Sequence, residues 1–163
     1  MNNKQEKVFE VLNALNIDYQ TINHSAVFTA EEGLNLNIPQ YGDMCKNLFL
    51  SDAQGKRHFL VVIYKDKKAD LKSIQKQLDC TRLSFASEER LYKYLQLQKG
   101  EVTPLGIIND LDALVEVVLD TDLVGKNKLG VHPNDNTATV WISYDALKKI
   151  IEQNGNIIHY VTI

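Results

Sequence analysis

The sequence predicts one α+β domain in which helices surround a mixed, mostly antiparallel sheet. The β-prone runs are short, and two of them are joined by a turn, as in a hairpin. The helical segments fall at irregular intervals, whereas a doubly wound fold alternates them with single strands. No internal repeat, low-complexity tract or Pro/Gly linker interrupts the 163 residues, so we expect one domain over residues 1–163.

Helices are predicted from apolar spacing and from capping residues. Val8, Val11, Leu12 and Leu15 recur at helical spacing and indicate an amphipathic helix over residues 3–15. Thr29, Ser87 and Ser143 are candidate N-caps of three later helices, because their side chains can accept hydrogen bonds from first-turn amides. The later helices are expected over residues 30–36, 70–78, 87–95 and 143–153, the last with Gly155 just beyond its end.

Strands are predicted where β-prone residues alternate or form short apolar runs. Residues 17–22 alternate apolar and polar side chains, as in a half-buried strand. Residues 45–51 and 59–64 flank a turn that contains Gly55, which predicts a hairpin. Residues 100–104 are expected to form a loop. Further strands are expected over residues 105–108, 114–119, 137–142 and 157–161.

The composition limits the class of protein. No window reaches the ~18 apolar residues that span a bilayer, and the first residues lack the apolar core of a signal peptide. Cys45 and Cys80 lie far apart, and no His/Cys cluster has zinc-ligand spacing. We therefore expect a cytoplasmic protein with no membrane contact, no metal and no cofactor.

The charge is unevenly distributed along the chain. The formal net charge is −3, yet residues 46–82 contain nine basic and four acidic residues. Such a segment could receive one polyanion locally. A solvated helix and hairpin would produce the same pattern, so charge alone leaves both interpretations open.

Known catalytic signatures are absent from the sequence, which contains no GxSxG, GxxxxGK[ST] or GxGxxG motif. Three sparse features remain. Lys46 and Asn47 lie near the start of a strand that is predicted to be buried. A charged side chain is rarely buried without a partner. The other two are the 100–104 loop and His132 before Pro133. Each of the three also fits a purely structural role as a strand end or a turn.

In this order and spacing, the features resemble the prolyl-tRNA editing superfamily, the aminoacyl-tRNA deacylases of the YbaK and ProX types. The resemblance covers HSAVFTAEE, MCKNLFLSD, LYKYLQLQKGEVTPLGIIND, VVLD and GVHPNDNTATVWIS. The segments VTPLGIIND and HPNDNTAT are most similar to the freestanding ProX-type alanyl-tRNA(Pro) deacylases. The resemblance implies the fold of the editing domain of prolyl-tRNA synthetase.

The resemblance also implies site residues. Lys46 corresponds to the essential lysine that holds a phosphate at the 3′ end of tRNA, and Gly100 and Pro104 to the ends of the catalytic loop. Hydrolysis in the family proceeds by water and the 2′-hydroxyl of the terminal adenosine, without a protein nucleophile, metal or cofactor. The substrate-binding residues are expected to be Phe28, Thr29, Asn47, Thr103 and His132. Phe28 as a core residue and Thr29 as a helix cap remain alternatives.

The expected function is hydrolysis of mischarged Ala-tRNA(Pro). The expected partners are the 3′ end of aminoacylated tRNA(Pro) and prolyl-tRNA synthetase. Two alternatives stay open: a Cys-tRNA deacylase, and a tRNA-binding or regulatory module without turnover. Leu105 stands where many relatives have Phe, and Asn134 and Asp135 are more polar than is usual in their segment. These departures put the substrate preference in question more than the class of activity.

Overall fold

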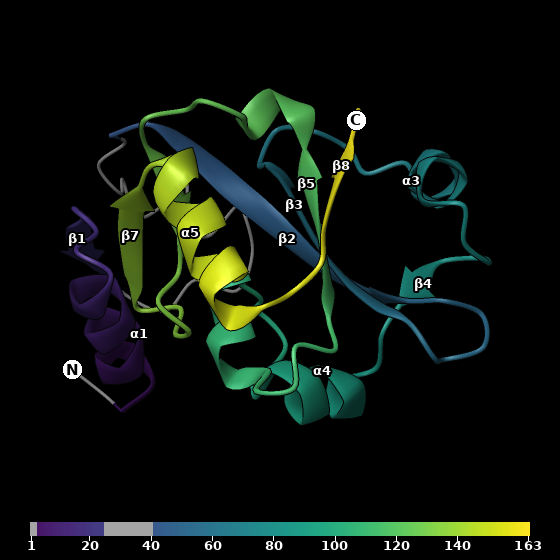
Figure 1. The fold of residues 1–163 in the computed structure, drawn as a ribbon, viewed down its shortest axis with the longest axis horizontal. Coiled ribbons are helices and arrows are strands. Elements are labelled where there is room, and N and C mark those ends of the chain that lie inside the picture. The colour runs from purple at the N-terminus through teal and green to yellow at the C-terminus, as the bar shows by residue number, and fades with distance from the viewer. Residues whose placement is uncertain (1–2, 25–40) are drawn as a thin grey trace.

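The computed structural model describes residues 3–24 and 41–163 (Figure 1). No helix in these two ranges has both the length and the apolar character that crossing a membrane requires. The helix expected over residues 30–36 lies outside the described residues.

Within residues 3–24 and 41–163, eight strands form one sheet in the order β1-β7-β6-β2-β3-β5-β8, with β4 paired to β2. Four of its neighbouring pairs are antiparallel and three are parallel, which confirms the expected mixed, mostly antiparallel sheet. The strands are β1 (Gln20–Asn23), β2 (Asp43–Ser51), β3 (His58–Tyr64), β4 (Ser84–Phe85), β5 (Glu116–Asp120), β6 (Leu129–Val131), β7 (Ala138–Ile142) and β8 (Ile158–Val161).

Helices cover both faces of the sheet, and a hydrophobic core lies on each side. Buried residues of α1, α4 and α5 pack in the larger core, together with alternate residues of β2, β3 and β5. Ile74 of α3 packs in the smaller core on the other face. Figure 1 shows α5 in front of the sheet and α3 at the right of the view, on the side of β8. The helices are α1 (Asn3–Ala14), α3 (Leu71–Leu78), α4 (Glu88–Leu95) and α5 (Tyr144–Asn154).

The N-caps predicted at Ser87 and Ser143 are confirmed by their hydrogen bonds, and Asp70 is a further cap that was not predicted. The side chains of Asp70, Ser87 and Ser143 each accept from a backbone amide in the first turn of α3, α4 and α5. Gly155 ends α5 with a φ of 95°, a left-handed conformation that glycine adopts without strain. Short polar side chains at these positions satisfy amides that a helix leaves unpaired.

The strand predicted over residues 105–108 is wrong. This segment is a 3₁₀ helix, η1 (Pro104–Asn109), with Thr103 as its N-cap. An apolar run that is buried on all sides has no period that separates a strand from a short helix. Pro104 at the first position and the bond from the Gly106 amide to the Thr103 carbonyl favour the helical turn.

Other differences concern strand ends and short strands. The strand expected over residues 17–22 begins only at Gln20, because Asn16 is left-handed and the Ile17 amide bonds back to Leu12. Strands β4 and β6 were not predicted, since two and three residues are too few to show alternation. A further 3₁₀ turn, η2 (Thr121–Leu123), follows β5.

Strand β2 has a gap along one of its edges. It pairs with β3 from Cys45 to Ser51, but on its other edge it pairs with β6 only at Asp43 and Met44 and with β4 only at Leu50 and Ser51. Among the described residues, no strand pairs with residues 45–49 on that edge, although the Ala86 amide donates to the Phe49 carbonyl over 2.9 Å. The pair Lys46–Asn47 therefore lies where the sheet opens.

Candidate functional site

Asn47 connects the gap in β2 to the 100–104 loop. Its Nδ2 donates to the Val102 carbonyl over 3.3 Å. The Asn47 Oδ1 is buried and has no hydrogen-bond partner in the described part of the chain. The strand motif and the loop motif, which are distant in sequence, are thus adjacent in the fold.

Thr103 connects the same loop to the histidine motif. Its hydroxyl donates to the His132 carbonyl over 2.6 Å and accepts from the Leu105 amide over 3.3 Å. The side chain is fully buried. Because one hydroxyl joins the loop, the start of η1 and the residue after β6, Thr103 fixes the position of all three.

His132 has a defined tautomer. Its Nδ1 lies 2.8 Å from the Ala138 carbonyl, which can only accept, so Nδ1 carries the proton and Nε2 has a free lone pair in the neutral ring. Burial lowers the pKa of His132, an effect that its bond to Ala138 partly offsets. The ring is therefore neutral at neutral pH and can accept a hydrogen bond at Nε2.

His24 belongs to the same neighbourhood, although sequence reasoning did not single it out. Its ring centroid lies 6.2 Å from that of His132, and its Nε2 is 2.9 Å from the Thr139 hydroxyl. His24 begins the motif HSAVFTAEE and Thr139 ends the motif NTAT. Membership of these motifs was the only sequence signal for either residue. The contact shows that these two motifs meet.

The 100–104 loop is held at its start by glycine geometry and by Glu101. Gly100 has a φ of 87°, where an added Cβ would be strained. The buried Glu101 carboxylate accepts from the Gln98 amide over 3.2 Å and from Lys4 over 3.4 Å. Among the described residues, none accepts a hydrogen bond from the backbone amides of Val102 and Thr103. Val102 is half-buried and lines a cavity, whereas Thr103 is fully buried.

Lys46 points away from the loop. Successive side chains of a strand face opposite sides of the sheet, so Lys46 and Asn47 lie on different faces of β2. The Lys46 ammonium donates to the Lys67 carbonyl. Lys67 itself binds Asp120 at 2.6 Å, Asp122 at 2.5 Å and the Ile163 carbonyl at 2.9 Å. The structure thus places Lys46 against the turn after β3.

The remaining predicted residues are placed as follows. Pro104 is the first residue of η1 and is buried. Phe28 and Thr29 lie outside the described residues. Asn134 and Asp135, the polar departures, form the turn after His132, where Asn134 has a φ of 60° and Asp135 accepts from the Thr137 amide over 2.8 Å.

Nucleophilic and metal chemistry gain no support from the described residues. Burial raises the pKa of Cys45 to about 12, so its thiol stays protonated. Burial also raises the pKa of Cys80. Within residues 3–24 and 41–163, no group of three or more His, Cys, Asp or Glu residues is placed to hold a metal ion.

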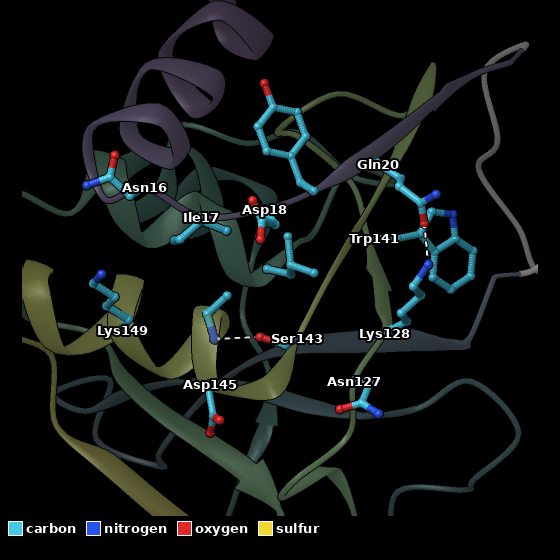
Figure 2. A pocket seen from close by; sticks show the side chains of 13 residues that line it. Asn16, Ile17, Asp18, Gln20, Asn127, Lys128, Trp141, Ser143, Asp145 and Lys149 are labelled. Carbon is cyan, nitrogen blue, oxygen red and sulfur yellow. Dashed lines mark hydrogen bonds between the residues drawn. The ribbon is translucent and has the colours of Figure 1, made fainter.

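Two cavities differ in their relation to these motifs. A cavity of about 400 Å³ is lined by Asn47, Gly100 and Val102 together with residues of β4 and α4. Another of about 480 Å³ lies between β1 and the start of α5 (Figure 2). In Figure 2, Lys128 donates to Gln20, and the Ser143 hydroxyl caps α5. The second cavity contains none of the predicted site residues.

Replacing Thr103 by valine tests the link between the loop and His132. The substitution keeps the shape but removes the hydroxyl, so the His132 carbonyl and the Leu105 amide lose their partner. We expect a loss of about 1–3 kcal/mol of unfolding free energy, measured by urea denaturation. Serine keeps the hydroxyl and is the matched control; a valine variant as stable as the serine variant would contradict the assignment.

Comparison with known proteins places the chain in a family. The model of the aminoacyl-tRNA editing domain matches residues 24–150. The chain is 51% identical over 152 residues to the prolyl-tRNA editing protein ProX of Acetoanaerobium sticklandii, covering 93% of each chain. It is 34% identical to prolyl-tRNA synthetase associated domain-containing protein 1 of Danio rerio, covering 91% of this chain and 82% of that protein.

A solved structure shares the fold. The crystal structure of a candidate trans-editing enzyme for prolyl tRNA synthetase superposes with a TM-score of 0.73, covering 100% of this chain and 99% of the other at 18% identity. At that identity the likeness concerns the arrangement of helices and strands alone. It agrees with the sheet described above.

Proposed function

The chain belongs to the aminoacyl-tRNA editing domain family, and on this premise we propose that it is a trans-editing hydrolase that cleaves the ester of mischarged tRNA(Pro). The observation that carries the proposal is the pair of hydrogen bonds from Asn47 to Val102 and from Thr103 to His132. These bonds bring Asn47, the 100–104 loop and His132 together, which supports a single site at that point, whereas Lys46 lies on the other face of β2. The substrate we propose is Ala-tRNA(Pro), with residues 1–163 acting as one domain.

The loop supplies the electrostatic part of the reaction. The amides of Val102 and Thr103 are the donors that we assign to the ester carbonyl as negative charge develops on its oxygen. Preorganised donors of this kind contribute about 3–4 kcal/mol to the lowering of an activation barrier. Gly100 and Pro104 keep the loop in the conformation that presents them. The attacking group is water, assisted by the 2′-hydroxyl of the terminal adenosine.

Lys46 anchors the substrate. A lysine ammonium is a compact charge with three donors and suits a phosphate oxygen. In the free protein it binds the Lys67 carbonyl, a neutral acceptor that a phosphate can replace with a stronger, charge-assisted bond. We assign to Lys46 the phosphate at the 3′ end of tRNA, and the basic residues of the 46–82 segment add a salt-dependent attraction.

His132 serves the amino-acid end of the substrate. Its neutral Nε2 can accept from the amine or the hydroxyl of the aminoacyl-adenosine. We also assign substrate binding to Phe28, Thr29, Asn47 and Thr103. Thr103 contributes by holding the residue after β6 in place. We place the reaction in the cytoplasm, and prolyl-tRNA synthetase is the candidate source of mischarged tRNA.

Hydrolysis rates of three substrates test the proposal. A synthetase pocket built for proline cannot exclude the smaller alanine, because missing methylene contacts discriminate by only about 1–3 kcal/mol each. A second, smaller site removes the error. We therefore expect kcat/KM for Ala-tRNA(Pro) to exceed that for Pro-tRNA(Pro) by at least about 100-fold, the range that a steric sieve of this kind supplies.

The same measurement separates the alternatives. Faster cleavage of Cys-tRNA(Pro) would identify a cysteinyl deacylase, and binding without cleavage of any ester would identify a tRNA-binding module. Equal rates on alanyl and prolyl esters would contradict the proposed selectivity.

A further inference from the structure

Helix α1 contacts the candidate site at three points, although it lies before the matched family region, which begins at residue 24. Its buried residues pack into the larger core and fix the helix against the sheet. Lys4 and Lys7, which lie about one turn apart, contact the segment that runs from the 100–104 loop through η1. These two contacts have no role in the reaction as described so far.

Lys4 pairs with a carboxylate that closes the start of the loop. The Glu101 carboxylate accepts from the Gln98 amide over 3.2 Å, and the Glu101 amide donates to the Gln98 carbonyl over 3.0 Å. These bonds fix the turn in which Gly100 has its left-handed conformation. The Glu101 side chain is only 11% exposed, and a charged side chain is rarely buried without a partner. Lys4 supplies that partner at 3.4 Å.

Lys7 holds the other end of the same segment. Its ammonium donates to the Asn109 Oδ1 over 2.8 Å, and the Asn109 Nδ2 donates to the Leu95 carbonyl over 2.9 Å. Asn109 is the last residue of η1, and Leu95 is the last residue of α4. The side chain of Asn109 therefore joins α1, η1 and α4 at one point.

Gln5 connects the same turn of α1 to the histidine side of the site. Its Nε2 donates to the Thr137 hydroxyl over 3.1 Å, and the residue is buried. The residue after Thr137 is Ala138, whose carbonyl orients the ring of His132. One turn of helix thus contacts both the loop and the segment that orients the histidine.

The exposure of the two lysines indicates that they act on position more than on stability. The Lys4 side chain is 42% exposed, and Lys7 is exposed as well. Exposed ion pairs contribute little to the free energy of unfolding. A displacement of about 1 Å at a reacting group can lower a rate about 100-fold, so a contact that is weak for stability can still control the reaction.

We propose that Lys4 and Lys7 are positioning residues for the proposed hydrolysis, which hold the two ends of the segment 101–109 in the geometry that the ester requires. The inference rests on the proposed function. Neither ammonium is assigned to the substrate, because Lys4 acts through Glu101 and Lys7 acts through Asn109. The backbone amides that we assign to the ester carbonyl lie between these two points.

Steady-state hydrolysis of Ala-tRNA(Pro) tests the role in the reaction. We expect Lys4→Met and Lys7→Met each to lower kcat about three- to tenfold with KM changed by less than about twofold, because the geometry of the transition state is lost and binding is kept. Lys4→Arg keeps the charge and should retain most of the rate. Lys148→Met is the matched control and should leave kcat unchanged, because Lys148 is similarly exposed, at 45%, and pairs with Glu152 of its own helix.

A double-mutant cycle tests whether Lys4 acts through Glu101. Glu101→Gln keeps the size of the side chain and an acceptor for the Gln98 amide, but it removes the charge. In this background, Lys4→Met should cause no further loss of kcat, whereas residues with independent roles give losses that multiply.

Amide hydrogen exchange of the free protein, followed by NMR, tests the position of the segment without a substrate. The Glu101 and Gly106 amides are hydrogen-bonded within the segment and its preceding turn. In the Lys4→Met/Lys7→Met double variant, we expect both amides to exchange about three- to tenfold faster, since local opening becomes easier. Amides of β3 should keep their wild-type rates.

The outcomes separate this inference from the proposed function. A loss of kcat no larger than that of Lys148→Met, or losses that multiply in the cycle, would overturn the positioning role while hydrolysis stands. Equal acceleration of exchange in β3 and in the segment would show a general loss of stability and would overturn it too. If the wild-type protein cleaves no ester, the proposed function fails, and exchange at Glu101 and Gly106 still decides whether the two lysines hold the segment.

Discussion

Replacing Lys46 by alanine is expected to lower kcat/KM for Ala-tRNA(Pro) by about 10- to 100-fold, the value of one hydrogen bond between charged groups. The ammonium is the group that we assign to the tRNA phosphate, and its only hydrogen bond among the described residues is to the Lys67 carbonyl. Losing it should leave the fold intact, because a neutral carbonyl near the surface can bond to water instead. Single-turnover deacylation of labelled Ala-tRNA(Pro) measures the effect.

The matched control for Lys46 is Lys68→Ala. Lys68 is an exposed residue of the same basic segment, so this variant changes the net charge equally. It should change the rate by less than about threefold, since an isolated surface charge is largely screened by salt. Similar losses in the two variants would show that Lys46 acts through the general field and not through a specific contact.

Replacing Lys67 by methionine is expected to lower the free energy of unfolding by about 3–5 kcal/mol, the usual cost of removing one partner from a buried ion pair. The Asp120 carboxylate is fully buried and accepts from the Lys67 ammonium over 2.6 Å. Hydrogen bonds to Asp120 and Asp122 raise the pKa of Lys67, so its ammonium stays charged throughout the neutral range. Urea denaturation with an unchanged m value reports the loss.

Lys148→Met is the control for this second prediction. Its ion pair with Glu152 is 3.9 Å long, and both side chains are largely exposed, so its removal should cost less than about 0.5 kcal/mol. A Lys67→Met loss as small as that of the control would mean that Asp120 is paired or hydrated in some other way. Lys67→Met should also slow deacylation, because Lys67 secures the turn whose carbonyl binds Lys46 in the free protein.

Much of the fold was predictable because its signals are local. The caps at Ser87 and Ser143, and the hairpin of β2 and β3, depend on residues that are close in sequence. The errors arose where local signals fail. Residues 105–108 form a uniformly apolar run, and only the cap from Thr103 and the position of Pro104 make it a 3₁₀ helix.

The sequence selected residues for the candidate site but could not give its geometry. Lys46, the 100–104 loop and His132 were each selected from the sequence, but side-chain alternation then separates Lys46 from Asn47 across the sheet. The contact of His24 with His132 joins two motifs about a hundred residues apart, and no local pattern could have paired them. Whether Phe28 and Thr29 join them stays a prediction.

By itself, the sequence determined the family, the mixed sheet with its surrounding helices, and the three motifs of the site. These follow from residue types and short spacings, which the chain carries before it folds. Only the tertiary structure decided the gap in β2, the bond from Thr103 to His132, and the burial of the Asn47 Oδ1 without a partner among the described residues. The physical reason is that such contacts depend on strand register and on long-range packing, which no local pattern encodes.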